Sequence, residues 1–180
     1  MRLRNIPAAR PAVENSKFCV RNPSEWKGKW NAFFGNENPI HVEIGMGKGQ
    51  FILAQAAAHP DVNYLGLERY ESVMYRAVQR MDGTAAASSE NAFPNVRLIC
   101  CDALEIADFF EKGEVERIYL NFSDPWPKAR QAPRRLTHRG FLEGYRRVLR
   151  PGGYLEFKTD NEGLFRFSME EFREIGRAHV

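Results

Sequence analysis

The sequence has few of the residues and runs that would assign it to several common protein classes. It contains only 3 cysteines, and Cys100 and Cys101 are adjacent, so their spacing gives neither a disulfide framework nor a zinc motif. The 4 histidines are scattered, and no apolar run approaches the ~20 residues of a membrane span. The basic start of the chain also lacks the apolar stretch of a signal peptide. We therefore expect a cytoplasmic protein without a metal site.

What is present is typical of one folded domain. The chain has 180 residues, of which 43% are hydrophobic and 27% charged, enough to bury a core. The net charge of +3 is modest, but 7 Arg/Lys face 2 acids in residues 1–30, and 8 face 1 acid in residues 128–150. Two basic segments around a more acidic centre indicate a polyanionic partner beside a site that is not itself basic. Solvated basic faces are the alternative.

Short apolar runs alternate with helical patterns along the chain. The predicted strands cover residues 40–44, 64–67, 96–100, 117–120 and 154–159. The predicted helices cover residues 50–58, 71–81, 104–110 and 140–149. This alternation, with short connections, predicts a parallel sheet covered by helices on both faces, which is an α/β fold of Rossmann type.

The segments outside this pattern are expected to be less regular. Residues 1–38 are predicted to form a basic arm rather than a core element, because three prolines interrupt any periodicity: Pro7, Pro11 and Pro23. Four aromatic residues are expected to dock this arm onto the domain of residues 39–174: Trp26, Trp30, Phe33 and Phe34. Residues 82–94, with their Ala/Ser run, are expected to be a loop.

The stretch Asn-Phe-Ser-Asp-Pro-Trp-Pro-Lys at residues 121–128 follows the fourth predicted strand. Pro125 and Pro127 fix their own φ and favour extended geometry in the residue before each of them. A rigid turn of this kind is well suited to presenting side chains, and ligands bind at the carboxyl ends of strands in open α/β sheets. The alternative is an ordinary tight turn around a half-buried Trp126.

A glycine-rich turn with Gly45, Gly47 and Gly49 follows the first predicted strand. Glycines let the backbone approach a ligand closely, and the following helix offers free N–H groups, so the turn fits any nucleotide-like ligand. Glu43 lies within the strand just before the turn. Its carboxylate would repel a pyrophosphate but would suit the ammonium and sulfonium groups of S-adenosylmethionine.

Two further acids follow the next two predicted strands. Glu68 ends the second strand, where a carboxylate can accept hydrogen bonds from ribose hydroxyls. Asp102 follows the third strand, where it can meet an adenine edge. Three acids at successive strand ends favour S-adenosylmethionine over NAD as the cofactor. Each acid alone has the alternative of being a helix N-cap.

Four segments together resemble the bacterial tRNA (guanine-N7-)-methyltransferase family, over nearly the whole chain. They are Glu-Ile-Gly-Met-Gly-Lys-Gly at 43–49, the octet at 121–128, Arg-Arg-Leu-Thr at 134–137 and Phe-Lys-Thr-Asp-Asn at 157–161. The octet is highly specific and the glycine turn much less so. The resemblance implies transfer of a methyl group from S-adenosylmethionine to N7 of guanine 46 in the tRNA variable loop. The sequence does not decide between a monomer and a homodimer.

The same resemblance assigns roles to individual residues. It implies that Asp124 stands at the catalytic centre, and that Lys128 and Asp160 contact the tRNA. The implied cofactor residues are Glu43, Glu68, Asp102 and Asp124. An exocyclic-amine methyltransferase and a non-catalytic fragment that binds S-adenosylmethionine or RNA remain alternative interpretations.

The residue types around the octet suggest further contacts with the substrate. Lys128, Arg130, Arg134 and Arg135 are expected to meet phosphates, which supply affinity rather than sequence choice. Trp126 has two interpretations, stacking on the target base or packing under the turn.

The end of the chain departs from the family pattern. The family has a late antiparallel hairpin and a Thr-x-x-Glu motif that this sequence lacks, and residues 175–180 resemble an in-frame translation of a sequencing-library adapter. The sequence therefore predicts a C-terminally truncated member with a non-native tail at 175–180; a natural short form is the alternative. Either way, residues 154–159 are expected to form an exposed, apolar sheet edge.

Overall fold

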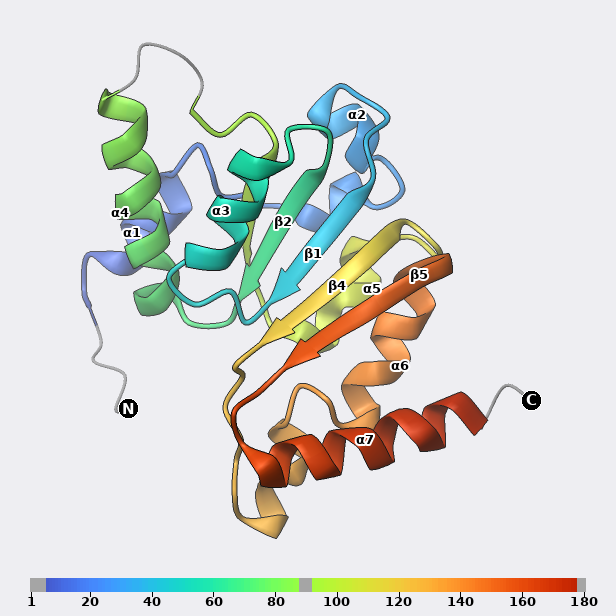
Figure 1. Ribbon diagram of the computed structural model, residues 1–180. Helices are drawn as coiled ribbons and strands as arrows, with labels where there is room; N and C mark the ends of the chain where they lie inside the picture. The colour runs from blue at the N-terminus through green and yellow to red at the C-terminus, as the bar shows by residue number, and fades with distance from the viewer. Residues whose placement is uncertain (1–5, 88–91, 178–180) are drawn as a thin grey trace.

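A computed structural model describes residues 6–87 and 92–177, and a five-stranded parallel sheet forms its centre (Figure 1). The strands are β1 (Ile40–Ile44), β2 (Asn63–Glu68), β3 (Val96–Cys100), β4 (Val115–Asn121) and β5 (Leu149–Lys158). They lie in the order β3-β2-β1-β4-β5, and each neighbouring pair is parallel. The predicted α/β fold of Rossmann type is confirmed.

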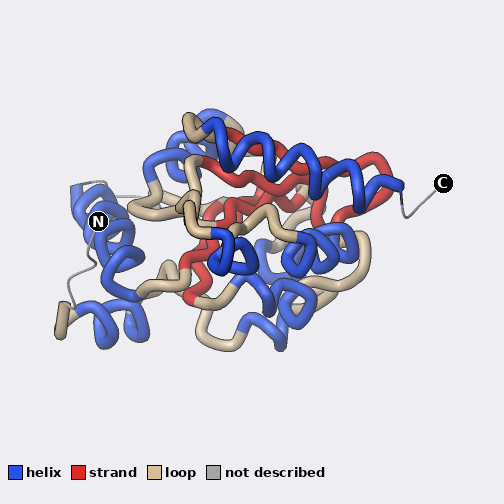
Figure 2. Tube along the Cα trace, turned by 90° about the horizontal axis from the view of Figure 1, so that it is seen from below, coloured by secondary structure: helices blue, strands red, loops and turns tan. Residues whose placement is uncertain are grey.

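Helices flank the sheet on both faces (Figure 2). They are α1 (Ala9–Asn15), α2 (Trp30–Phe34), α3 (Gln50–Ala58), α4 (Glu71–Ala87), α5 (Ile106–Phe109), α6 (Arg139–Val148) and α7 (Glu162–Arg177). Short 3-10 turns lie at η1 (Pro23–Trp26), η2 (Ala103–Glu105) and η3 (Ala129–Arg134). One core lies between the sheet and α2, α5 and α6, and a second core lies between the sheet and α1, α3 and α4.

The strand order reverses at β1. Strands β2 and β3 lie on one side of β1, and β4 and β5 lie on the other. The helices after β1 and β4 consequently pack on opposite faces of the sheet. In open α/β sheets ligands bind at such a reversal point, outside the carboxyl ends of the two strands, and the term crevice refers below to this place. The glycine turn follows β1 and the octet follows β4, so the two most distinctive motifs of the sequence meet at this crevice.

The N-terminal segment is more regular than its prolines suggest. Helix α1 accommodates Pro11 because this residue lies in its first turn, where backbone N–H groups have no partner within the helix. Cys19 forms a parallel bridge with Leu98 of β3. Trp30 is fully buried, and its indole N–H donates to the carbonyl oxygen of Phe109 at 2.9 Å. The expectation of an arm without core elements is wrong.

Docking of this segment through its aromatic side chains is confirmed. Trp30 belongs to the core on the α2, α5 and α6 face, and three neighbouring aromatic side chains pack against that core: Trp26, Phe33 and Phe34. The division of the chain at residue 38 stays a prediction.

Helix α4 continues past Met81 to Ala87, so the loop predicted for residues 82–94 is wrong over that part. The run of alanines favours helix, and the Thr84 hydroxyl donates to the carbonyl oxygen of Arg80 at 3.0 Å. The other end of the predicted loop includes residues 88–91, which lie outside the described residues.

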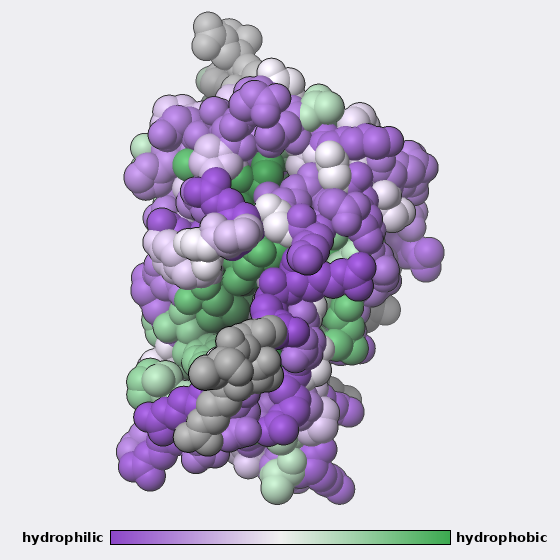
Figure 3. All heavy atoms as spheres, turned by 90° about the vertical axis from the view of Figure 1, so that its right-hand side faces the viewer, coloured by the Kyte–Doolittle hydropathy of each residue, from purple (hydrophilic) through white to green (hydrophobic). Residues whose placement is uncertain are grey.

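Strand β5 forms one edge of the sheet, and α7 packs beside it. The rings of Phe157 and Phe172 meet edge to face at 6.0 Å, and Ile175 packs against the same core. Tyr154 is 46% exposed. Figure 3 shows the side of the molecule where β5 is outermost, and a hydrophobic band there is flanked by hydrophilic residues. That residues 175–180 are a non-native tail stays a prediction.

We expect the exposed β5 edge to promote self-association. Tyr154→Lys places a charge on this edge, and should weaken association by about tenfold, because a lysine opposes strand pairing between molecules. Tyr70→Lys is the matched control, since Tyr70 is similarly exposed (41%) but lies after β2. Light scattering over a concentration series measures the effect. A parent protein that stays monomeric throughout would contradict the expectation.

The described residues contain neither a membrane-spanning helix nor a cluster of metal ligands. No helix within residues 6–87 and 92–177 is long and apolar enough to cross a membrane. Within the same ranges, no three His, Cys, Asp or Glu side chains are grouped so that they could hold a metal ion.

Candidate active site

The turn after β1 brings backbone N–H groups to the crevice. Gly45, Gly47 and Gly49 have φ of 71°, 59° and 76°, a left-handed conformation that would strain a residue with a side chain. The Gly45 N–H donates to the carbonyl oxygen of Leu67 at 2.9 Å, which fastens the turn to β2. Gly49 is the N-cap residue of α3, so the first turn of α3 follows directly. The geometry suits close approach of a ligand.

Glu43 is a buried carboxylate with one unsatisfied oxygen. Its side chain lies on β1, and the residue is 3% exposed. The Asn121 amide donates to Oε1 at 3.1 Å, whereas Oε2 is buried without a hydrogen-bond partner. Burial raises the pKa of Glu43 to about 7, and the negative charge of Glu68 adds to the rise; the hydrogen bond from Asn121 and the nearby backbone N–H of Ile52 offset it only in part. A cation beside Oε2 would stabilise the charged form.

Glu68 binds the glycine turn from the end of β2. Its Oε2 accepts the N–H of Gly47 at 3.1 Å, and its Oε1 accepts the N–H of Tyr70 at 3.0 Å. Burial raises the pKa of Glu68, these backbone hydrogen bonds oppose the rise, and the negative charge of Asp124 adds to it. Strands β2 and β4 both pair in parallel with β1, so the carboxyl ends of β2 and β4 lie at the same edge of the sheet.

Asp102 is the N-cap of η2. Its Oδ1 accepts the N–H of Leu104 at 3.0 Å, and its own N–H donates to Glu105 at 2.9 Å, so the two acids form a capping box. The Arg69 guanidinium lies 3.6 Å from Oδ2. The N-cap alternative is therefore confirmed for Asp102. Its contact with an adenine edge stays a prediction.

The octet presents Asp124 to solvent in a strained turn. Asp124 is exposed and makes no hydrogen bond to the residues that the structure describes. Phe122 and Trp126, two residues away on either side, have φ of 51° and 44°, a left-handed conformation that residues with side chains seldom adopt. The extended geometry predicted before Pro127 is therefore wrong for Trp126.

Arg135 supplies the physical reason for this conformation. Its Nε donates to the carbonyl oxygen of Pro125 at 3.1 Å, and an NH2 group of the same guanidinium donates to the carbonyl oxygen of Trp126 at 3.0 Å. The guanidinium also lies 4.4 Å from the ring centroid of Phe167 in α7. Two charge-assisted hydrogen bonds from outside the octet thus stabilise a turn that local preferences disfavour.

The other predicted substrate residues surround the octet and lie in solvent. Lys128, Arg130, Arg134 and Asp160 are exposed. The Arg134 guanidinium lies 5.1 Å from the ring centroid of Trp126, whose side chain is partly buried. Trp126 therefore packs against Arg134 in this structure. Contacts of these side chains with RNA stay predictions.

The segment after the octet is fastened to α7 by buried polar contacts. The hydroxyl oxygens of Thr137 and Ser168 are 2.7 Å apart, and both residues are fully buried. The Arg139 guanidinium donates to Glu171 at 2.8 Å. Leu136 covers the glycine turn closely, since its Cδ1 would lie 3.3 Å from a Cβ added at Gly45. Helix α7 therefore supports the site although it supplies none of the predicted contacts.

The two neighbouring arginines allow a matched comparison. Arg134→Gln should weaken tRNA binding at low salt and reduce the salt slope by somewhat under one unit, as expected for one lost phosphate contact. Arg135→Gln should instead lower the free energy of unfolding by ~1.5–3 kcal/mol, because two carbonyl oxygens lose a charged donor. Filter binding over a salt series and urea denaturation measure the two effects. Identical salt slopes for the parent and Arg134→Gln would place Arg134 on a solvated face.

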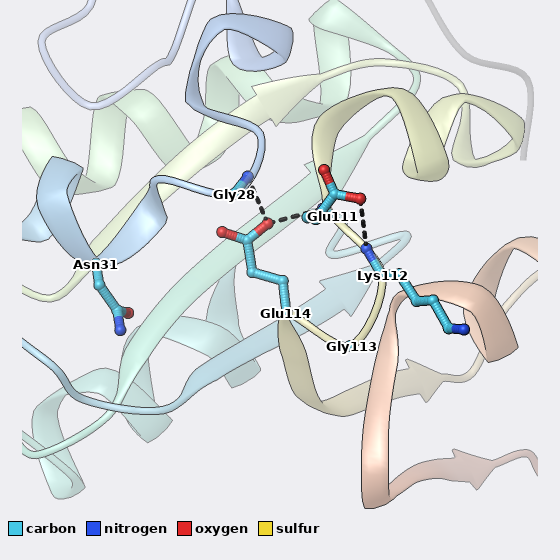
Figure 4. Close-up of a pocket in the computed structure, with 6 residues that line it drawn as sticks. All are labelled: Gly28, Asn31, Glu111, Lys112, Gly113 and Glu114. Atoms are coloured by element: carbon cyan, nitrogen blue, oxygen red, sulfur yellow. Dashed lines mark hydrogen bonds between the residues drawn. The ribbon is translucent and has the colours of Figure 1, made fainter.

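A hollow of about 350 Å³ lies away from this crevice, next to the start of β4 (Figure 4). Glu114 accepts the N–H groups of Gly28 at 2.9 Å and Glu111 at 2.8 Å, and its other oxygen accepts the N–H of Trp30 at 3.2 Å. The carboxylate is thus occupied in fastening the start of α2 to the start of β4. The hollow offers no comparable unsatisfied group, and the candidate site remains the crevice. The residues that line the hollow are Gly28, Asn31, Glu111, Lys112, Gly113 and Glu114.

Comparison with known proteins identifies the family of this chain. A family model described as "Putative methyltransferase" matches residues 37–179. The tRNA (guanine-N(7)-)-methyltransferase of Bacillus subtilis (strain 168) is 49% identical over 177 residues, which cover 98% of this chain and 80% of that protein. The chain belongs to the tRNA (guanine-N7-)-methyltransferase family. The enzyme of the same name from Geobacillus sp. (strain WCH70) is 48% identical, over 98% of this chain and 77% of that protein. The resemblance identified from four short segments is confirmed.

Solved structures show that the fold of this methyltransferase is widely shared. A mutant 16S rRNA (adenine(1408)-N(1))-methyltransferase from Catenulisporales acidiphilia, crystallised with its cosubstrate, superposes with a TM-score of 0.57 at 24% identity. The match covers 79% of this chain and 58% of that one. At this level of identity the likeness concerns the fold alone.

Three residues of the candidate site were not predicted from the sequence. Asn121 and Ser123 each carry a buried side-chain oxygen without a hydrogen-bond partner, and the Asn121 amide nitrogen donates to Oε1 of Glu43. The sequence contains a signal for Asn121 and Ser123, because polar residues at the end of a buried strand rarely lack a hydrogen-bond partner. Phe122, between them, is 66% exposed. An isolated phenylalanine in the sequence gives no sign of its exposure.

Proposed function

We propose that this chain transfers the methyl group of S-adenosylmethionine to N7 of a guanine in tRNA, at position 46 of the variable loop. The observation that carries the proposal is the crevice between the ends of β1 and β4. There a buried, half-satisfied carboxylate, Glu43, is hydrogen-bonded to Asn121. The exposed and unpaired carboxylate of Asp124 follows three residues later. The buried Glu43 suits a cationic cofactor, and the exposed Asp124 suits a substrate that arrives from solvent.

The crevice residues fit the parts of this cofactor. When bound, S-adenosylmethionine supplies an electrophilic methyl group on a cationic sulfur. Glu43 Oε2 is the unpaired acceptor for its ammonium group. The oxygens of Glu68 each accept one backbone N–H and keep a lone pair for ribose hydroxyls. Asp102 Oδ2 remains close to the adenine position at the end of β3, and the glycine turn brings backbone near the cofactor's amino-acid part.

Guanine N7 carries a free lone pair at neutral pH, so no proton must leave before the methyl group is transferred. The residues therefore need to position the base rather than to act as a general base. Asp124 accepts hydrogen bonds from the N1 and N2 donors of the guanine, because both of its oxygens are unpaired and exposed. Since Glu43 binds the ammonium group, Asp124 remains available for the base.

Basic residues at the end of the octet and after it hold the RNA backbone. Lys128, Arg130 and Arg134 are exposed within one short segment beside Asp124, so they can neutralise adjacent phosphates while the base enters the crevice. Asp160, exposed after β5, contacts the substrate from the neighbouring strand end.

The test is to incubate the chain with an unmodified tRNA transcript and labelled S-adenosylmethionine, and to identify the methylated nucleoside after digestion. We expect N7-methylguanosine, and we expect it to disappear when guanine 46 of the transcript is replaced by adenine. A methyl group on an exocyclic amine would identify a different methyltransferase. Cofactor binding without any methyl incorporation would identify a non-catalytic binding protein.

A further inference from the structure

Phe122 combines two unfavourable features at the centre of the site. It is the most exposed large hydrophobic residue among those that the structure describes, at 66%. Its φ of 51° also places it in the left-handed region, which disfavours a residue with a Cβ. Glycine or asparagine would be the natural residue at such a position. A phenylalanine that is both strained and in water contributes little to the stability of the free protein.

The backbone holds Phe122 in this conformation from both sides. Its N–H donates to the carbonyl oxygen of Lys158 at 2.8 Å, which fixes it to the end of β5. The preceding Asn121 is fixed to Glu43, and the following Ser123 is partly buried. The backbone of Phe122 is therefore held in place two residues before Asp124. Strain that the surroundings maintain in this way is a sign of a functional constraint.

Of the two aromatic rings in the octet, Phe122 is the one with a free face. The ring of Trp126 is partly buried and has the Arg134 guanidinium 5.1 Å from its centroid. No aromatic or cationic partner of Phe122 occurs among the described residues. Three exposed basic side chains lie at the end of the octet and shortly after it: Lys128, Arg130 and Arg134.

We propose that Phe122, rather than Trp126, is the platform on which the target purine stacks. Every base has a π face, and a base taken out of its own stack gains from an aromatic surface in the enzyme. Stacking on Phe122 would fix the plane of the guanine while Asp124 accepts hydrogen bonds at its edge. The inference rests on the proposed function, since it assigns a contact of the same substrate.

Four substitutions at Phe122 separate stacking from strain and from simple burial. Phe122→Leu keeps an apolar side chain without a π face, and should lower kcat/KM for tRNA by about 10- to 100-fold, the loss expected for one base–aromatic stack. Phe122→Tyr and Phe122→Trp keep the ring and should stay within about threefold of the parent. Phe122→Gly should lose activity as Phe122→Leu does, yet raise Tm, because glycine adopts φ near 51° without strain. Affinity for S-adenosylhomocysteine should stay the same in all four.

Three results would overturn the inference. Phe122→Leu with the kcat/KM of the parent would show that no stack forms. A Phe122→Gly protein with lower Tm and weaker S-adenosylhomocysteine binding would show that the ring has a structural role. The third result concerns binding: equal tRNA affinities of Phe122→Leu and Phe122→Tyr, measured if the parent chain has no methylation activity, would show that no base stacks on Phe122. The lack of activity itself would contradict the proposed function and not the role of Phe122.

Discussion

Asp124→Asn is expected to lower kcat for tRNA methylation by roughly 10²-fold or more, the scale of losing one key electrostatic group. The substitution keeps the shape of the side chain, but one of its two acceptor oxygens becomes an amide donor. Facing the N1 and N2 donors of guanine, that amide would repel the base it should hold. Single-turnover methylation with saturating tRNA and cofactor measures the effect.

Two comparisons make this result specific. Asp108→Asn removes a similarly exposed carboxylate from α5, away from the crevice, and should leave kcat unchanged. S-adenosylhomocysteine affinity should change by less than about threefold in Asp124→Asn, because Glu43 and not Asp124 binds the ammonium group. A tenfold weaker affinity for S-adenosylhomocysteine would indicate that Asp124 contacts the cofactor. If turnover of Asp124→Asn stays within about twofold of the parent, the octet has a structural role and Asp124 is not central to catalysis.

Glu43→Gln is expected to weaken cofactor binding by ~1.5–3 kcal/mol, because a charge-assisted hydrogen bond to the ammonium group is lost. In the parent, affinity should also fall as the pH drops below about 7, where Glu43 becomes protonated in the free protein. The Gln variant should lack this pH dependence. Calorimetric titration with S-adenosylhomocysteine between pH 5.5 and about 8.5 measures both effects. Unchanged affinity in Glu43→Gln would remove the main physical argument for a cationic cofactor.

The same substitution should stabilise the free protein above neutral pH. The pKa of Glu43 rises from 4.5 to about 7 on folding, so the folded state binds more protons between these values, and stability falls as the pH rises through this window. At pH 8 the buried charge then costs about 3 kcal/mol, which glutamine avoids. Urea denaturation should show Glu43→Gln more stable than the parent at pH 8 and similar to it at pH 4.5. Glu143→Gln, on the exposed side of α6, serves as the control.

The sequence predicts the sheet well because buried parallel strands have a simple signature. All residues of β1 and β2 are buried, and most of them are apolar, with two polar residues in each strand. The ends of these strands carry the predicted acids, so the position of Glu43 and Glu68 follows from the strand assignment. That these acids lie around one crevice follows from the parallel order of the strands alone.

What the sequence does not predict depends on contacts between distant residues. Pro127 favours an extended Trp126, but Arg135 binds its carbonyl oxygen and the left-handed conformation prevails. Helix α7 follows the last predicted strand with no motif of its own, yet Ser168 and Thr137 join it to the site. The single unpaired oxygen of Glu43 also depends on how Asn121 is oriented from another strand.

The position of β1 at the centre of the sheet has a consequence for the order of events during folding. Strand β1 pairs with β2, which follows it closely, and with β4, whose partner residues lie more than seventy positions later in the chain. Closing so long a loop costs entropy before any contact across it contributes, and non-local pairing of this kind slows folding. The hydrogen bond between Asn121 and Glu43 spans the same pair of strands. A nascent chain can therefore assemble the β1–β2 half and its glycine turn early, whereas the octet reaches the crevice only after synthesis has passed β4.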